Sequence, residues 1–143
     1  MSAPGYDPNN VFAKILRGEL PSVKVFEDES VLVIMDVMPQ AEGHTLVIPK
    51  AASRNILDIS GADLTQAILA VQRVTRAVKK AFDVPGMLVM QFNESAAGQT
   101  VFHTHFHVIP RREGVPLKPH TGGMADPKIL AGHAERIRAA LTG

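Results

Sequence analysis

The chain has 143 residues, of which 45% are hydrophobic and 20% charged, and its formal net charge is +1. These values are typical of one globular domain and provide no electrostatic attraction to nucleic acid or to an anionic membrane. The lack of cysteine excludes disulfides and thiolate zinc ligands. Because no apolar run approaches the roughly 20 residues of a membrane helix, and the N-terminus does not resemble a signal peptide, we expect a cytoplasmic protein with no membrane or nucleic-acid partner.

The first half of the chain predicts one short helix and three strands. Residues 1–9 are rich in proline, glycine and asparagine and predict a loose arm. Asn10 is a good N-cap for a helix that ends near Gly18. Alternating apolar residues predict strands over residues 23–27, 31–36 and 44–48, with a turn at 28–30 and a loop at 39–43.

The second half predicts the longest helix, further strands and a final helix. Ser60 and Asp63 resemble a capping box that begins a helix reaching Phe82. Its apolar residues recur every three or four positions: Leu64, Ile68, Val71, Val74, Val78 and Phe82. Residues 87–92 predict a strand, 111–125 an irregular segment, and 126 onward a helix with Leu130, Ile137 and Leu141 on one face. Since long crossovers are few, we expect an α+β domain with helices packed on an antiparallel sheet of about five strands.

Three of the six histidines alternate within residues 101–110, namely His103, His105 and His107. The β-branched and aromatic residues around them favour a strand that ends at Pro110. The three imidazoles would then share one face, while Phe102, Phe106 and Val108 would point into a core. A solvated polar face is the simplest explanation for one histidine, but three in register favour a chemical site.

Two kinds of chemistry fit this pattern. The histidines could bind a metal, with His44 as a further ligand, or one imidazole could be a nucleophile tuned by its neighbours. No cluster of Asp and Glu accompanies the histidines in the sequence, which favours the nucleophile. The preceding loop contains Asn93, Gly98, Gln99 and Thr100, whose amide, hydroxyl and backbone N–H donors suit a phosphate group.

These residues also carry a resemblance to a known family. His103-Thr-His105-Phe-His107-Val-Ile is similar to the His-φ-His-φ-His-φ-φ signature of the histidine triad (HIT) family of nucleotide hydrolases and transferases, with Thr104 at the first φ position. Residues 97–101 and 43–50 resemble the family's other two hallmarks, and residues 12–21 and 25–28 its N-terminal segment. The likeness covers residues 10–112 and is strongest to the Hint-like branch.

The resemblance implies one HIT domain over residues 1–143, with 113–143 as a C-terminal extension containing a helix. It implies a homodimer. From the missing cysteines and the lack of a carboxylate cluster in the sequence we expect no bound metal, and we expect no cofactor. The Cys-x-x-Cys zinc motif of many bacterial members is replaced by Asn10-Val-Phe-Ala13. His120 and His133 match no motif, and we expect both on the surface.

The resemblance also implies a role for each site residue. His105 would be the nucleophile, with His103 and His44 as a hydrogen-bonded relay behind it. His107 and the backbone of Gln99 and Thr100 would hold the α-phosphate, with Asn93 and Gly98 beside them. Asp36 would accept from the ribose hydroxyls, although a turn-forming role is the alternative. The base pocket would be lined by Val11, Phe12, Ile15, Ile34 and Val37.

The implied activity is hydrolysis or nucleotidyl transfer at the α-phosphate of an adenosine- or guanosine-type 5′-phosphoramidate or acyl-nucleotide. A nucleotidyl-histidine intermediate would release a nucleoside monophosphate. Three alternatives remain open at this point. The chain could hydrolyse dinucleoside polyphosphates with the same nucleophile, bind or sense purine nucleotides with incidental turnover, or act as a zinc-dependent hydrolase.

Overall fold

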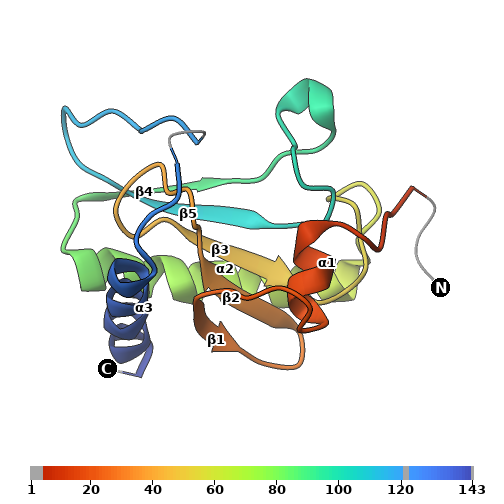
Figure 1. The fold of residues 1–143 in the computed structure, drawn as a ribbon, viewed down its shortest axis with the longest axis horizontal. Helices are drawn as coiled ribbons and strands as arrows, with labels where there is room; N and C mark the ends of the chain where they lie inside the picture. Colours follow the sequence, from red (N-terminus) through yellow and green to blue (C-terminus); the bar gives the residue numbers. More distant parts are fainter. Residues whose placement is uncertain (1–4, 121–122, 143) are drawn as a thin grey trace.

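The computed structural model describes residues 5–120 and 123–142. The elements in chain order are α1 (Val11–Leu16), β1 (Lys24–Glu27), β2 (Val31–Met35), β3 (Thr45–Pro49), α2 (Gly61–Phe82), β4 (Gly86–Met90), the short 3₁₀ helix η1 (Ser95–Ala97), β5 (Phe106–Arg111) and α3 (Pro127–Thr142). The strands form one antiparallel sheet in the order β1-β2-β3-β5-β4 (Figure 1). The predicted α+β fold is therefore confirmed. Within the described part of the chain, no helix is both long and apolar enough to cross a membrane.

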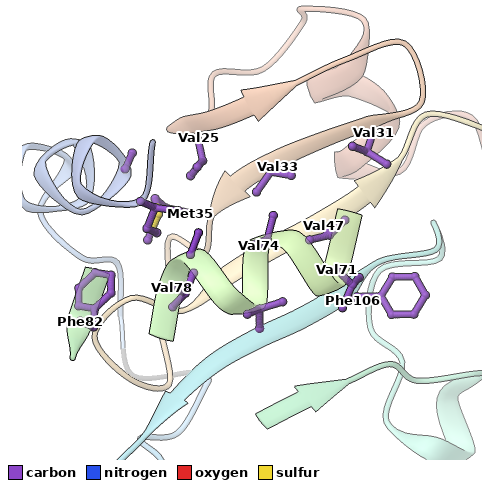
Figure 2. Close-up of a cluster of buried hydrophobic side chains, with 14 of the residues drawn as sticks. Val25, Val31, Val33, Met35, Val47, Val71, Val74, Val78, Phe82 and Phe106 are labelled. Atoms are coloured by element: carbon purple, nitrogen blue, oxygen red, sulfur yellow. The ribbon is translucent and has the colours of Figure 1, made fainter. Parts of the chain in front are cut away.

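The period-two alternation of the strands divides the sheet into two buried faces. On β2, Val31, Val33 and Met35 pack against α2 and α3. Leu32 and Ile34, from the same strand, point to the opposite face and pack against Phe12 of α1. Figure 2 shows the first of these faces, with valines of β1, β2 and β3 directed at the valines of α2. The site described below lies on the other face, under α1.

Helix α2 begins and ends through local chemistry that the sequence contains. The Ser60 hydroxyl accepts from the amide of Asp63, and Asp83 ends the helix in a left-handed conformation (φ 48°). Val71, Val74, Val78 and Phe82 are buried as predicted. Ile68 is not, because Ala67 faces the core at that level and leaves the Ile68 side chain 47% exposed.

The C-terminal helix α3 packs on the same face of the sheet as α2. Leu130 and Ile137 are buried in the cluster that contains the α2 valines, and Leu141 packs at its edge. The predicted apolar face of this helix is therefore confirmed. The position of α3 beside α2 determines the path that the chain must take after β5.

The histidine segment differs from its prediction. The regular strand β5 begins only at Phe106, so His103 and His105 precede it. The amide of Thr104 donates to the carbonyl oxygen of Ser53 at 2.9 Å, and this replaces a bond to a neighbouring strand. Phe106 and Val108 enter the core as predicted. Phe102 does not, and lies half-buried beneath the Arg54 guanidinium, 4.2 Å from the ring centroid.

Pro110 also departs from its expected place at the end of the strand. It lies within β5, paired with Met87, and the strand continues to Arg111. Proline lacks the backbone N–H donor, so it can occupy a strand position whose N–H would not hydrogen-bond to a neighbouring strand.

The first prediction concerns the oligomeric state. Strand β4 is an edge of the sheet, and edge strands present unpaired backbone groups that can pair with a second chain. Val89 on this edge and Ile68 on α2 are exposed apolar residues. We expect a two-fold homodimer, which sedimentation should report as twice the 15.4 kDa chain mass at micromolar concentration.

Ile68→Glu should shift this equilibrium toward monomer, because it would bury an unpaired charge at the interface. The matched control is Ile129→Glu, which places the same charge on an exposed position of α3. A wild-type protein that sediments only as a 15.4 kDa species would contradict the dimer.

Candidate active site

A cavity of about 510 Å³ opens on the α1 face of the sheet, within the range typical of small-molecule sites. Its lining is partly apolar and includes all five residues expected for the base pocket: Val11, Phe12, Ile15, Ile34 and Val37. His105 and His107 add polar groups to the same lining. The cavity can therefore hold a ligand with one flat apolar part and one polar or anionic part.

His44 and His107 form a buried hydrogen-bonded pair on adjacent strands. His44 Nδ1 accepts from the backbone amide of Gln40 at 3.0 Å. A neutral imidazole has one donor and one acceptor nitrogen, so His44 Nε2 carries the proton and donates to His107 Nδ1 at 2.9 Å. By the same rule, His107 carries its own proton on Nε2. The chain of contacts therefore makes His107 Nε2 a hydrogen-bond donor.

His105 has the opposite tautomer. Its Nδ1 lies 2.6 Å from the carbonyl oxygen of His103, which can only accept, so Nδ1 carries the proton. Nε2 therefore has a free lone pair, and among the described residues it has no hydrogen-bond partner. Phe12 packs edge-on against the His105 ring, with centroids 4.8 Å apart. The arrangement provides a fixed, unprotonated ring nitrogen beside the donor of His107.

The relay implied by the family resemblance is not formed between His103 and His44. The His103 ring contacts the Tyr6 hydroxyl at 2.6 Å and the carbonyl oxygen of Pro49 at 2.7 Å. His44 pairs with His107 instead. His103 acts on His105 through its backbone carbonyl, because the chain leaves the regular strand geometry before Phe106.

Burial keeps these four imidazoles neutral. Loss of hydration penalises the charged form and lowers the pKa of His44 to about 3 and the pKa of His107 to about 3. The same cause lowers the pKa of His103 and that of His105. A neutral His105 at pH 7 retains the lone pair that a nucleophile requires.

His120 lies in the site, contrary to the expectation that it is a surface residue. Its Nε2 donates to Oδ2 of Asp36 at 2.8 Å, and its ring centroid lies 6.1 Å from that of His107. The segment that carries it is joined to the loop after β2, because the amide of Lys118 donates to the carbonyl oxygen of Gln40 at 2.7 Å. No periodicity marks this irregular segment, so sequence patterns could not place it.

Asp36 is buried and combines two roles. Its Oδ1 accepts from the amide of Met38 at 2.8 Å, a turn-forming contact, while Oδ2 faces His120 and lies 3.4 Å from His44 Nε2. Asp36 also lines the cavity. Oδ2 of Asp36 can therefore accept a hydrogen bond from a ligand hydroxyl only in competition with His120.

In the loop before the histidines, some residues line the cavity and others hydrogen-bond within the loop and to its neighbours. Gly98 and Thr100 line the cavity, and Gly98 needs its glycine because its φ is 100°. The buried Gln99 side chain accepts from the amide of Glu94 and from Asn55, and donates to the carbonyl oxygens of Arg54 and Val101. Asn93 bonds Gln91 and the amide of Ile56 rather than lining the cavity. Gln99 and Asn93 therefore shape the loop.

A possible metal-binding group also lies here. One ligand atom from each of Asp36, His44 and His107 falls within 4.8 Å of the others. This donor set suits zinc, although in the structure His44 hydrogen-bonds to His107 and Asp36 to His120. The carboxylate comes from a distant part of the sequence, which explains why no cluster is evident there.

His133 is likewise not a surface residue. Its ring packs edge-on against Phe82, 5.1 Å between centroids, and its Nδ1 is buried without a partner among the described residues. It belongs to the contact between α3 and the end of α2, outside the cavity.

The second prediction follows from the lowered histidine pKa values. In the unfolded chain these imidazoles protonate near pH 6.5, whereas in the folded chain the pKa of each is lowered, to about 3 for His44 and for His107. Protons therefore bind preferentially to the unfolded state, and the free energy of unfolding should fall as pH drops from about 7 to 5. An imidazole that stays neutral in the folded chain, such as His44 or His107, contributes about 1 kcal/mol per pH unit averaged over this range, and at most about 1.4 at its lower end.

Urea unfolding at several pH values measures this slope, and His107→Gln, which removes one of the buried imidazoles, should make it shallower. NMR should also show His44 neutral at pH 5. An unfolding free energy that does not change between pH 7 and 5, or a His44 titration midpoint near 6.5, would contradict the assignment.

Comparison with known proteins identifies the family. A family model described as HIT domain matches residues 17–114, more than half of the chain. Adenosine 5'-monophosphoramidase HNT1 of Saccharomyces cerevisiae is 39% identical over 114 residues, covering 79% of this chain and 70% of that protein. A solved Hit-like protein from Bartonella henselae is similar with a TM-score of 0.91 at 56% identity, covering 94% of this chain and 98% of that one. A Zn-bound histidine triad family protein from Mycobacterium smegmatis has a TM-score of 0.82 at 35% identity and covers 94% of each chain. The chain described here therefore belongs to the HIT family.

Proposed function

We propose that this protein hydrolyses or transfers nucleotides at the α-phosphate, through a covalent intermediate on His105. The observation that carries the proposal is the tautomer of His105. Its Nδ1–H is held by the His103 carbonyl oxygen at 2.6 Å, which leaves Nε2 unprotonated in a ring that lines the cavity. An imidazole in this state is a nucleophile that needs no separate base to activate it.

The chemistry proceeds in two displacements. The Nε2 lone pair of His105 attacks the α-phosphorus and a P–N bond forms, which leaves the imidazole as a cation that keeps its Nδ1–H. The bond from phosphorus to the leaving group breaks with its electron pair; a carboxylate leaves as the anion, and an amine leaves after its nitrogen takes a proton from solvent. Water then attacks phosphorus and releases a proton to solvent, the P–Nε2 bond breaks with its electron pair returning to Nε2, and the nucleoside monophosphate leaves. Throughout, the Nε2–H of His107 can donate to a phosphoryl oxygen, which stabilises the charge that develops there. The paired His44 keeps that proton on Nε2.

The remainder of the cavity suits a purine nucleoside 5′-phosphoramidate or acyl-nucleotide. Phe12, Ile15 and Ile34 provide an apolar surface for a base. Asp36 lines the same cavity and can accept from ribose hydroxyls once His120 moves aside. The phosphoramidase name of the yeast relative supports this substrate class.

The third prediction tests the nucleophile and the substrate class together. A panel of adenosine and guanosine 5′-phosphoramidates, acyl-nucleotides and dinucleoside polyphosphates should show fastest turnover of the first two classes. His105→Ala should lose on the order of 10⁶ in kcat, like the removal of other nucleophiles. His107→Ala should lose about 10²–10³, like one oxyanion donor. The control His133→Ala removes an imidazole outside the cavity and should leave kcat near that of wild type.

Quenching wild type during turnover should leave a nucleoside monophosphate mass on the peptide containing His105, in an acid-labile, alkali-stable bond. A label on His103 or His107 would assign the nucleophile elsewhere. Fastest turnover of dinucleoside polyphosphates would replace the substrate class, and binding without turnover would favour a nucleotide sensor.

The fourth prediction is metal independence. The two displacements use imidazole groups alone, so turnover should survive prolonged EDTA treatment. Added zinc should inhibit, because Asp36, His44 and His107 could bind it and His107 would then no longer be held by His44. Loss of activity on chelation that zinc restores would instead establish a zinc-dependent hydrolase.

A further inference from the structure

Tyr6 is a buried residue of the N-terminal segment, which the sequence predicts to be a loose arm. Its side chain is 9% exposed, and its hydroxyl lies 2.6 Å from His103 Nδ1. The two rings pack edge-on with centroids 5.6 Å apart. Arg54 secures the same segment by donating to the carbonyl oxygen of Gly5 at 2.9 Å. This part of the chain precedes residues 17–114, which match the HIT domain.

The direction of the Tyr6 hydrogen bond follows from the other side of the His103 ring. His103 Nε2 faces the carbonyl oxygen of Pro49 at 2.7 Å, and a carbonyl only accepts, so Nε2 carries the proton. In the neutral ring Nδ1 is then an acceptor, and the Tyr6 hydroxyl is its donor. Burial, which raises the pKa of Tyr6, keeps that donor protonated.

His103 matters because its backbone carbonyl selects the tautomer of His105. Residues 103–105 lie outside the ladder of β5, so regular strand pairing does not fix this carbonyl. Its position depends on the contacts of the segment itself. These are the two hydrogen bonds of the His103 ring and the bonds between Thr104 and Ser53.

We propose that Tyr6 is a positioning residue for the nucleophile His105, acting through His103. The catalytic role of His105 rests on the function proposed above, whereas the positioning itself can be tested without substrate. Tyr6 does not line the cavity, so it acts on the rate of the chemical step and not on nucleotide binding. The N-terminal segment is thereby part of the catalytic apparatus of this chain.

The test compares wild type with Tyr6→Phe, which removes only the hydroxyl. Long-range ¹H–¹⁵N NMR of the free protein reports which ring nitrogen of His103 and of His105 carries the proton. In wild type the proton should be on Nε2 of His103 and on Nδ1 of His105. In Tyr6→Phe, His105 should become a mixture of tautomers, and kcat should fall about tenfold or more while KM stays near that of wild type, since one buried acceptor has lost its donor.

The matched control is Thr75→Val, which removes a partly buried hydroxyl that donates to the carbonyl oxygen of Val71 within α2. It should change neither the NMR pattern nor kcat. Wild-type kcat in Tyr6→Phe, or a wild-type His105 with its proton on Nε2, would overturn the proposal. A wild-type His105 with its proton on Nε2 would overturn the proposal even if Tyr6→Phe does not fold. A wild type that turns over no nucleotide would refute the proposed function, while the change in the His105 tautomer from wild type to Tyr6→Phe would still decide the role of Tyr6.

Discussion

The hydrogen bond from His105 Nδ1–H to the carbonyl oxygen of His103 is the contact on which the site depends. It decides which nitrogen of His105 is free, and the proposed attack on phosphorus requires that nitrogen to be Nε2. In a regular strand that carbonyl would point sideways to a neighbouring strand. The chain makes it available by leaving the ladder before Phe106, and Tyr6, Pro49 and Ser53 hold the released segment in place.

The sheet provides the second constraint, because alternation places the other imidazoles on the same face. His44 lies two residues before Leu46, which faces α1 and pairs with His107 of β5. The two rings therefore meet beneath the cavity at hydrogen-bonding distance. The opposite face of these strands packs on α2, so the positions of His44 and His107 are supported by the main core. A rigid sheet thus sets the position of His107, the proposed phosphate-binding donor, while an irregular segment sets that of His105, the proposed nucleophile.

The C-terminal extension alters the rim of the cavity. Because α3 packs beside α2, the chain must cross from the end of β5 back over the loop after β2. Backbone bonds from Lys118 to Gln40 and from Ala125 to Val37 join the two segments. This crossing brings His120 to Asp36, although His120 lies outside the residues that match the HIT domain. Family likeness alone would therefore miss one of the polar groups that line the cavity.

The sequence by itself determined the regular elements and the central motif. Residues such as Val33, Val74 and Ile137 repeat with the period of a strand or a helix, and each is buried where that period places it. Only the tertiary structure decided the hydrogen-bond partners of Tyr6, His103 and His120. These residues lie in segments without periodicity, and their partners are 97, 54 and 84 residues distant in the chain. A local pattern reports which face of an element is buried, but it contains no information on which distant hydrogen-bonding groups an irregular segment will meet.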